Sequence, residues 1–156
     1  DIAPIIRDSQ HEVSLFWTDE ETGIEMCARL DMLRLWKTEG VACIDDVKSA
    51  KSADPEDFMK ACMDCGYDIQ AFTYIEGVRH VFGIEKVQFA FDVVEKTAPY
   101  LSVRYTAPDS MIELGRIKYR SALKKLSECN ATKIWQGYQS GELPPPPVWE
   151  MKKWGM

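Results

Sequence analysis

The segment VACIDDVKSA (residues 41–50) decides the fold that we expect of this chain and the site that we expect on it. Its first eight residues begin apolar, as a buried strand does, and then carry two aspartates and a lysine. Because side chains alternate along a strand, Asp46 and Lys48 point to one face. Asp45 and Val47 point to the other face. The sequence therefore predicts a carboxylate beside an ammonium group on one face of a core strand.

Asp31 is a second carboxylate that the fold brings to this strand. It ends the apolar stretch GIEMCARLD (23–31), which is expected to form a hairpin with the next strand through the turn-like WKTEG (36–40). Mg²⁺ is held by one or two carboxylates together with waters and phosphate oxygens, so Asp31 and Asp46 are candidate metal ligands. Lys48 would orient or deprotonate a water, or neutralise charge on a phosphoryl group. The alternative is a surface ion pair of little energetic value.

The segment YDIQAFTYIEGVRHVFG (67–83) adds two polar side chains. Its apolar spacing predicts an amphipathic helix that ends near Gly83. Gln70 and Tyr74 are four residues apart and therefore share a face of this helix. If that face packs against the sheet, both groups need hydrogen-bonding partners, which the metal-site carboxylates or a substrate phosphate would provide. The alternative is a helix flank on which both reach water.

The remaining segments complete an α/β plan of one compact domain over residues 1–156, because a chain of this length can bury one core. Strands are expected at 11–18, 24–33, 41–48, 86–96 and 100–107, and helices at about 55–66, 67–83 and 110–129. Asp54 or Ser52 is the expected cap of the first helix, with Pro55 at its first position. Gly66 is expected to end that helix.

The tail at residues 137–156 has a different composition. Four prolines, Pro144–Pro147, favour an extended polyproline conformation and cannot pair inside a sheet. We expect Trp149 and Trp154 to strap this tail across its own domain or across a neighbouring subunit. The alternative is that the prolines are a ligand for another module.

The net charge of −6 is unusual for a protein that binds DNA through its phosphates, since such proteins usually carry a basic patch. The candidates for phosphate contact are Lys51 and the basic residues of the last long helix, namely Arg116, Lys118, Arg120, Lys124 and Lys125. The alternative for this helix is an ordinary solvated face.

The five cysteines are odd in number and fall mostly in apolar patterns, which suits reduced thiols in a reducing compartment. Cys62 and Cys65 form a C-x-x-C pair, but a zinc or iron–sulfur site would need further ligands that the other cysteines do not supply in the required arrangement. No apolar run approaches the ~20 residues of a membrane span, so we expect a cytoplasmic protein with no membrane contact.

Asp31, DVKSA (46–50) and YDIQAFTY (67–74) together resemble the signature of the PD-(D/E)xK nucleases, in particular the RecE-like exonucleases (exonuclease VIII type) of phages and prophages. The resemblance covers most of the chain. It implies a restriction-endonuclease-like core with a central mixed sheet flanked by helices. It also implies the site roles: Asp31 and Asp46 with the Val47 carbonyl hold the metal, Lys48 is the catalytic lysine, and Gln70 with Tyr74 orients the site.

The sequence departs from that family in three places. Leu30 precedes Asp31 where the family usually has proline, and Ser49 stands where threonine is common. Relatives also carry an upstream helical segment, often with a histidine that faces the metal, and we expect this segment to be missing here. His11 lies too close to the first strand to replace that histidine, while Glu12 is an acid of the kind that can sit near the site.

The resemblance implies a Mg²⁺-dependent exodeoxyribonuclease, with Mn²⁺ as a second usable ion. Its activity would be 5′ to 3′ digestion of linear double-stranded DNA for recombination by single-strand annealing, with a RecT-like annealing protein as partner and a ring of three or four subunits. One alternative is a non-catalytic, truncated nuclease-fold domain that binds a protein partner or DNA. Another is an endonuclease or repair nuclease of the same superfamily.

Overall fold

The computed structural model describes residues 3–138 and 140–155 and folds them around one five-stranded sheet. The strands are β1 (Gln10–Thr18), β2 (Glu25–Trp36), β3 (Val41–Ala50), β4 (Lys86–Glu95) and β5 (Ser102–Thr106), in this order across the sheet. The helices are α1 (Ala3–Asp8), α2 (Pro55–Cys65), α3 (Tyr67–Phe82), α4 (Asp109–Thr132) and α5 (Val148–Lys153).

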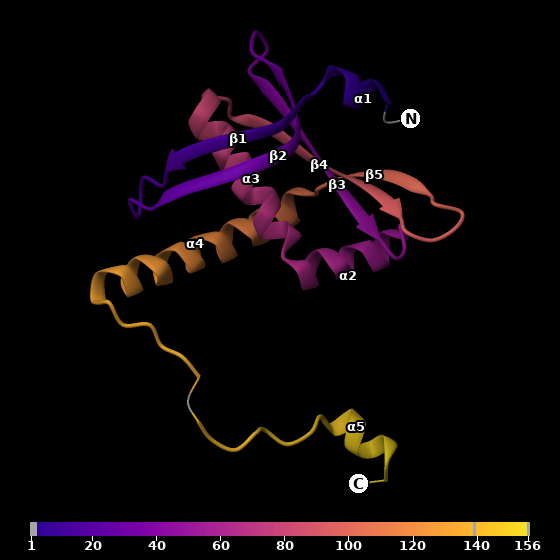
Figure 1. The fold of residues 1–156 in the computed structure, drawn as a ribbon, viewed down its shortest axis with the longest axis vertical. Coiled ribbons are helices and arrows are strands. Elements are labelled where there is room, and N and C mark those ends of the chain that lie inside the picture. Colours follow the sequence, from indigo (N-terminus) through magenta and orange to yellow (C-terminus); the bar gives the residue numbers. More distant parts are fainter. Residues whose placement is uncertain (1–2, 139, 156) are drawn as a thin grey trace.

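The sheet is mixed, and β3 is its central strand. Neighbouring strands are antiparallel except for β3 and β4, which run parallel with Val41 opposite Lys86 and Asp46 opposite Phe91. A parallel pair needs a crossover connection, and α2 and α3 provide it. Figure 1 shows α2, α3 and α4 gathered on one side of the sheet. The helix-facing side of β3 is therefore the inside of the molecule.

The core lies between this side of the sheet and α3. Ile44 and Phe91 from the central strands and Val78 from α3 are at most 2% exposed. Helix α4 packs on the outer side of α3 through a smaller cluster. In this cluster the rings of Phe72 and Tyr119 meet edge to face, with centroids 5.3 Å apart. Burial of these large apolar side chains is the main term that holds the three layers together.

Local chemistry fixes the crossover between β3 and β4. The Asp54 side chain accepts hydrogen bonds from the backbone N–H groups of Glu56 and Asp57, and Pro55 takes the first position of α2. Gly66 has a φ of 70°, a left-handed conformation in which glycine avoids the penalty of a Cβ atom. It ends α2 and directly precedes α3, so the two helices meet at a sharp turn.

The predicted elements are confirmed, with shifts at their ends. β2 extends three residues beyond Leu33, β3 two beyond Lys48, and α4 three beyond Cys129. The hairpin of β4 and β5 is antiparallel, as expected. The sequence did not predict α1, a single short helix beside the start of β1 in Figure 1.

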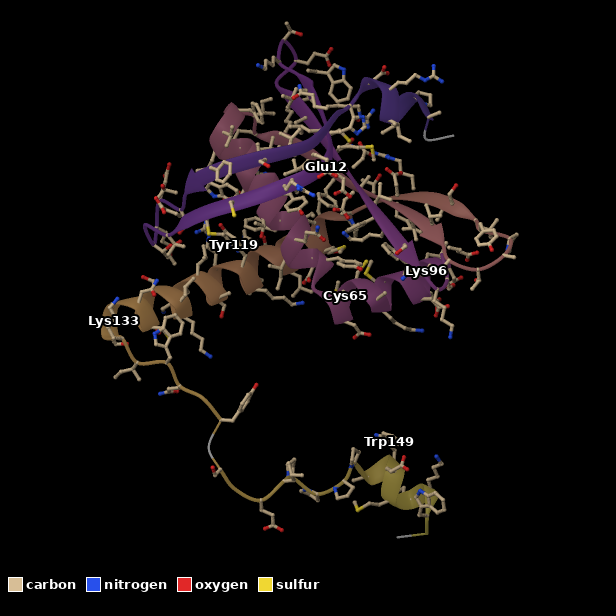
Figure 2. The ribbon with its side chains drawn as sticks, in the orientation of Figure 1. Glu12, Cys65, Lys96, Tyr119, Lys133 and Trp149 are labelled. Carbon is tan, nitrogen blue, oxygen red and sulfur yellow. The ribbon has the colours of Figure 1, made fainter. Side chains whose placement is uncertain are left out.

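The described residues do not strap the tail across its own domain, and the other expected arrangement, a strap across a neighbouring subunit, stays a prediction. The chain leads away from α4 and ends in α5, whose Trp149 and neighbouring Trp154 are 70% and 74% exposed. Figure 2 shows Trp149 on α5, apart from the body that holds Tyr119 and Glu12. The four prolines are in no helix or strand, and Pro147 caps the start of α5.

Among the helices in the described part of the chain, none combines the length and the hydropathy that crossing a membrane requires.

The helices α3 and α4 approach most closely at Gly115. A Cβ atom at this position would lie 2.0 Å from the backbone oxygen of Asp68, whereas one at Gly137 would meet nothing within 4 Å. We predict that Gly115→Ala lowers the free energy of unfolding by about 1–3 kcal/mol or more, because backbone must shift to make room. Urea unfolding measures this change, and Gly137→Ala is the control without it. Equal stability of the two variants would contradict the close approach.

Candidate active site

Asp46 and Lys48 lie together on the helix-facing side of β3, as predicted. Lys48 Nζ forms an ion pair with Asp46 Oδ2, and the two side chains are 14% and 1% exposed. Asp45 points to the opposite face, where it accepts hydrogen bonds from Arg34 and Arg104. The pair of Asp46 and Lys48 is therefore a buried ion pair, and the alternative of a surface pair does not hold.

Asp31 occupies a break in the alternation of β2. Leu30 and Leu33 both lie in the core with 0% exposure, although they are three residues apart. In a regular strand, residues three apart point to opposite faces, so the alternation of β2 changes between Leu30 and Leu33. The register with β1 is unbroken across this change, with Val13 opposite Leu30 and His11 opposite Met32, so β2 gains no residue relative to β1. Asp31 directly follows Leu30 and lies within the change of alternation.

Asp31 lies beside the end of β3 that carries Asp46 and Lys48. The register of the two strands pairs Met32 with Asp45, and one further step brings Asp31 next to Asp46. The backbone N–H of Val47 donates a hydrogen bond to Asp31 Oδ2 over 2.9 Å. Asp31 and Val47 also line an open pocket of about 360 Å³. The two predicted metal-binding carboxylates are thus neighbours, with the Val47 backbone at the same place.

Helix α3 brings Gln70 and Tyr74 to this end of β3. Gln70 Nε2 donates to Asp46 Oδ1 over 3.1 Å and lies 3.0 Å from the Tyr74 hydroxyl oxygen, to which it also donates. The prediction that this helix face packs against the sheet is confirmed, and the alternative of two solvated side chains is not. Because the amide holds one oxygen of Asp46 and Lys48 holds the other, the orientation of the carboxylate is fixed.

The site carries an excess of negative charge. Burial raises the pKa of Asp46 above its usual value and the nearby charge of Asp31 raises it further, while the ion pair with Lys48 acts in the opposite direction. Burial also raises the pKa of the Tyr74 hydroxyl, and the charges of Asp46 and Asp31 add to this effect. Both directions mean that a cation bound between the two aspartates would be favoured.

The donor set fits a hard divalent cation. Asp46 Oδ2 is buried and makes no hydrogen bond beyond its ion pair, so it has capacity for a further positive partner. Among residues 3–138 and 140–155 no group of three or more histidine, cysteine or acidic side chains is arranged to hold a metal. Two carboxylates and a backbone carbonyl, completed by water and phosphate oxygens, are a set that Mg²⁺ accepts and zinc does not favour.

Glu12 and His11 line the same pocket as Asp31, but each has a partner of its own. Glu12 Oε2 lies 2.7 Å from Arg29 Nε in an ion pair whose side chains are mostly exposed. His11 Nε2 lies 2.8 Å from the backbone oxygen of Ile6 in α1. A contribution of Glu12 to the site stays a prediction. His11 is held toward α1 by its contact with Ile6.

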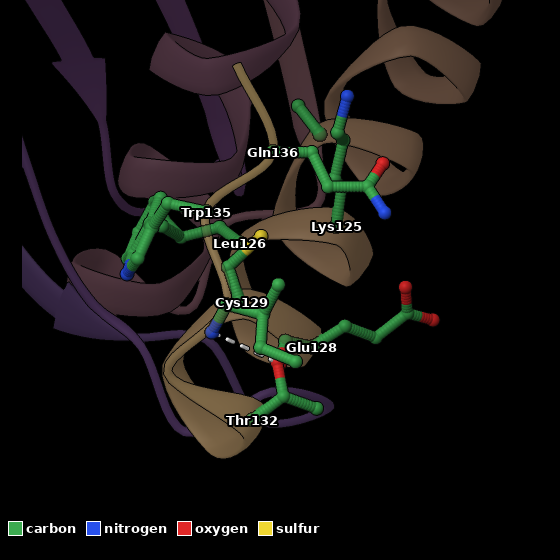
Figure 3. A pocket seen from close by; sticks show the side chains of 9 residues that line it. Lys125, Leu126, Glu128, Cys129, Thr132, Trp135 and Gln136 are labelled. Carbon is green, nitrogen blue, oxygen red and sulfur yellow. Dashed lines mark hydrogen bonds between the residues drawn. The ribbon is translucent and has the colours of Figure 1, made fainter.

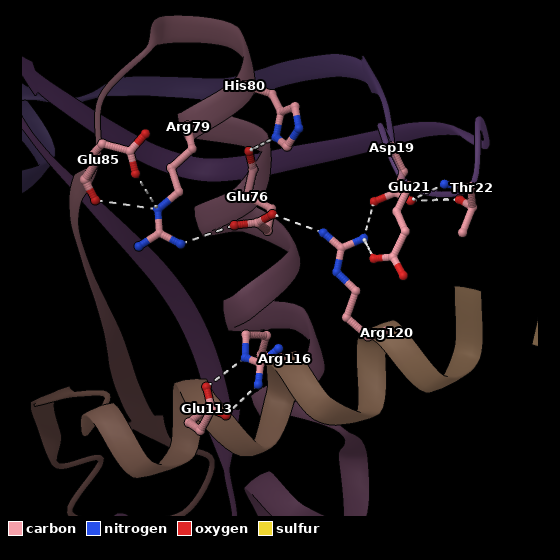
Figure 4. Close-up of polar contacts among 10 residues, drawn as sticks. All are labelled: Asp19, Glu21, Thr22, Glu76, Arg79, His80, Glu85, Glu113, Arg116 and Arg120. Atoms are coloured by element: carbon pink, nitrogen blue, oxygen red, sulfur yellow. Dashed lines mark hydrogen bonds and ion pairs between the residues drawn. The ribbon is translucent and has the colours of Figure 1, made fainter. Parts of the chain in front are cut away.

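Three of the basic residues predicted to contact phosphate are engaged by acidic side chains. The pairs are Arg116 with Glu113, Lys118 with Asp68, and Arg120 with Asp19, Glu21 and Glu76. Figure 4 shows Arg120 reaching from α4 to α3 and to the turn between β1 and β2. These contacts favour the alternative reading of the three residues as ordinary structural and surface charges.

The cysteines are free thiols, as expected from their number. Cys43 and Cys62 are buried, whereas Cys65 and Cys27 are exposed. A pocket of about 580 Å³ lies beside Cys129, between the end of α4 and residues 134–136. Figure 3 shows its lining, which includes Lys125, a candidate for phosphate contact, but none of the predicted metal-binding or catalytic residues.

Sequence reasoning missed Tyr67, the first residue of α3. Lys48 Nζ lies over its ring, 4.6 Å from the centroid. One signal could have found it, because Tyr67 is three residues before Gln70 and so belongs to the same helix face as Gln70 and Tyr74.

A family model described as "PDDEXK-like domain of unknown function (DUF3799)" matches residues 6–143. No curated protein matches the chain. The chain is similar to the crystal structure of a protein described as a "Putative exonuclease" from Eubacterium rectale, with 19% identity and a TM-score of 0.64. This match covers 99% of the present chain and 64% of the other chain, so the present chain spans less than two thirds of that protein.

The crystal structure of SSO0001 matches with 11% identity and a TM-score of 0.44, and the match covers 92% of this chain and 55% of that chain. The likeness to the Eubacterium rectale protein is one of fold. Together with the family match, it confirms the predicted fold class, an α/β restriction-endonuclease-like core with a mixed sheet flanked by helices.

We predict that Asp46→Asn stabilises the metal-free protein at neutral pH. Because folding raises the pKa of Asp46, this group adds to the free energy of unfolding at a pH below its unfolded-state pKa. That contribution is lost as the pH rises through the folded-state pKa. The variant should therefore match the wild type in acid and exceed it at neutral pH. Urea unfolding of both proteins across this pH range gives the difference curve.

Asp92, whose pKa burial also raises, titrates in both proteins; the Asp46 charge is a minor cause of that rise, so its removal changes the difference curve in the same direction. A difference curve that is flat, or that falls as the pH rises, would contradict the assigned electrostatics.

Proposed function

The chain belongs to the family of PDDEXK-like domains that matches its residues 6–143, and from this premise we propose that it is a Mg²⁺-dependent exodeoxyribonuclease acting on linear double-stranded DNA. The superfamily predicted from the sequence is confirmed by this membership. The observation that carries the proposal is the convergence of Asp46, Lys48 and Gln70 beside Asp31. The RecE-like resemblance adds 5′ to 3′ digestion for recombination by single-strand annealing, an annealing protein as partner, and a ring of three or four subunits.

In this proposal Asp31, Asp46 and the Val47 carbonyl hold Mg²⁺, with Mn²⁺ as an alternative ion. When bound, the ion would supply Lewis-acid activation of water and of the phosphoryl oxygens. The proximity of Asp31 supports this assignment, because burial is the main cause of the raised pKa of Asp46 and the charge of Asp31 adds to it.

Lys48 would stabilise the negative charge that develops on the phosphoryl group and assist removal of the proton from the attacking water. Its ammonium is held on one side of Asp46 by the ion pair. Gln70 holds the other oxygen of Asp46, and the Tyr74 hydroxyl in turn accepts from Gln70. This chain of contacts keeps the carboxylate in one orientation, as efficient catalysis requires.

A second candidate function is a non-catalytic nuclease-fold domain that binds a protein partner or DNA. The observation that favours it is the engagement of Arg116, Lys118 and Arg120 by acidic side chains in a chain of net charge −6. An endonuclease of the same superfamily is the alternative among enzymes. Digestion of defined DNA substrates separates all three.

We predict that the protein releases nucleotides from end-labelled linear duplex DNA with Mg²⁺ but not with EDTA, and that closed circular DNA survives. Lys48→Ala should lower the rate by about 10²–10⁴-fold, because the positioned acid–base and charge-stabilising group is lost. Lys60→Ala is the matched control, since Lys60 is an exposed lysine paired with Asp57. Cleavage of circular DNA would indicate an endonuclease, and a folded protein inactive on every substrate would favour the binding domain.

We also predict that Mg²⁺ or Mn²⁺ raises the melting temperature of the wild type, because an ion bound only by the folded state stabilises it. The gain is about 2.7 kcal/mol at 100 times the Kd. Asp31→Asn and Asp46→Asn should each lose most of this shift, whereas Asp57→Asn, on the surface of α2, should keep it. Scanning fluorimetry measures the shift, and an equal shift in all four proteins would place the ion elsewhere.

A further inference from the structure

Two side chains contact the Lys48 ammonium group, and the sequence pattern predicted only one of these contacts. Asp46 forms the ion pair, while the ring of Tyr67 lies beneath the ammonium with its centroid 4.6 Å from Nζ. Lys48 is 14% exposed, so little water competes for its charge. A cation over an aromatic face is attracted by the ring quadrupole, and the attraction grows as the cation is desolvated.

The ring of Tyr67 is itself fixed by the fold. It follows Gly66, whose left-handed conformation sets the turn between α2 and α3. It packs against Phe58 of α2 and Phe91 of β4, with centroid distances of 6.3 and 6.1 Å. Phe91 is the β4 residue directly opposite Asp46 in the parallel register. Three elements thus hold the ring at the level of the site.

Beside Asp46, the thiol of Cys62 and the hydroxyl of Tyr67 add no negative charge that would compete with the ring for Lys48. Burial raises the pKa of the nearby Cys62 thiol to about 11, so this thiol is neutral at physiological pH. Burial also raises the pKa of the Tyr67 hydroxyl, and Cys65 adds to that effect, so the ring stays a neutral phenol. The ring face is therefore the part of Tyr67 that meets the ammonium.

We propose that Tyr67 is a positioning residue for Lys48, whose ring face keeps the ammonium at the site when the Asp46 carboxylate is shared with a metal ion. This inference rests on the proposed function. The lysine stem is flexible, and within residues 3–138 and 140–155 its ion pair is with the carboxylate that the metal would also bind. Because the Tyr67 ring binds no metal, it would hold Lys48 both in the metal-free protein and in the metal-bound protein.

The test compares Tyr67→Phe, which keeps the ring face, with Tyr67→Leu, which removes it. In Mg²⁺-dependent digestion of linear duplex DNA, Tyr67→Leu should lower kcat by about 3- to 30-fold, the range to which a cation–π attraction converts, with KM changed by less than about 2-fold. Tyr67→Phe should retain the wild-type kcat. A loss of activity that Phe does not rescue would overturn the proposal, because the hydroxyl would then be the required group.

A second measurement needs neither metal nor activity. In the NMR spectrum of the metal-free protein, the Cε methylene of Lys48 should be shifted upfield by the ring current of Tyr67, with the signal assigned through its loss in Lys48→Arg. The shift should persist in Tyr67→Phe and vanish in Tyr67→Leu. An unchanged Lys48 signal in Tyr67→Leu would overturn the proposal.

The same spectra report whether each variant is folded. Should Tyr67→Leu not fold, Tyr67→Met replaces it, since the flexible methionine side chain fills irregular space without offering an aromatic face. A wild type without nuclease activity would contradict the proposed function, and the NMR comparison would still decide whether the ring holds the lysine.

Discussion

Asp46 places a carboxylate in the interior, on the central strand of the sheet, where its side chain is 1% exposed. An ionised carboxylate withdrawn from water is costly unless it is paired and hydrogen-bonded. The surrounding structure meets this requirement in part: Lys48 from the same strand and Gln70 from α3 take its two oxygens. Asp31 brings a second negative charge close to Asp46, and the cation of the proposed function would balance it. The packing of α3 against β3 at Gln70 follows from this arrangement.

The opposite face of β3 shows what a fully balanced buried carboxylate looks like in the same protein. Asp45 is 0% exposed and is held by two guanidinium groups, those of Arg34 and Arg104, at 2.8 and 2.6 Å. Arg34 takes one oxygen of Asp45 through a single nitrogen, and Arg104 takes the other. A second buried acid, Asp92, lies 3.9 Å from Arg104, so two guanidinium groups face two carboxylates here. Asp46 has one ammonium and one neutral amide instead. The contrast between these two adjacent aspartates supports the proposed cation-binding role of Asp46, whereas Asp45 has structural partners.

Local periodicity was sufficient to predict much of this. The alternation of β3 and the four-residue spacing of Gln70 and Tyr74 depend only on neighbours in sequence, and both were predicted correctly. The change of alternation in β2 was not predicted, since the burial of both Leu30 and Leu33 in one core depends on the tertiary structure. The partners of Arg120 were missed for a related reason, because Asp19 lies 101 residues away in sequence. Pairings of this kind are set by how α4 packs on α3, which no window of sequence contains.

The central claim is that Asp31, Asp46 and the Val47 carbonyl form one metal site at the end of β3. Crystals of the protein soaked in Mn²⁺ and measured for anomalous scattering test it most directly. The account predicts an anomalous peak within coordination distance of both carboxylates and of the Val47 carbonyl oxygen, with Lys48 still beside Asp46. A Mn²⁺ peak bound at other residues, with these two carboxylates left without metal, would contradict it.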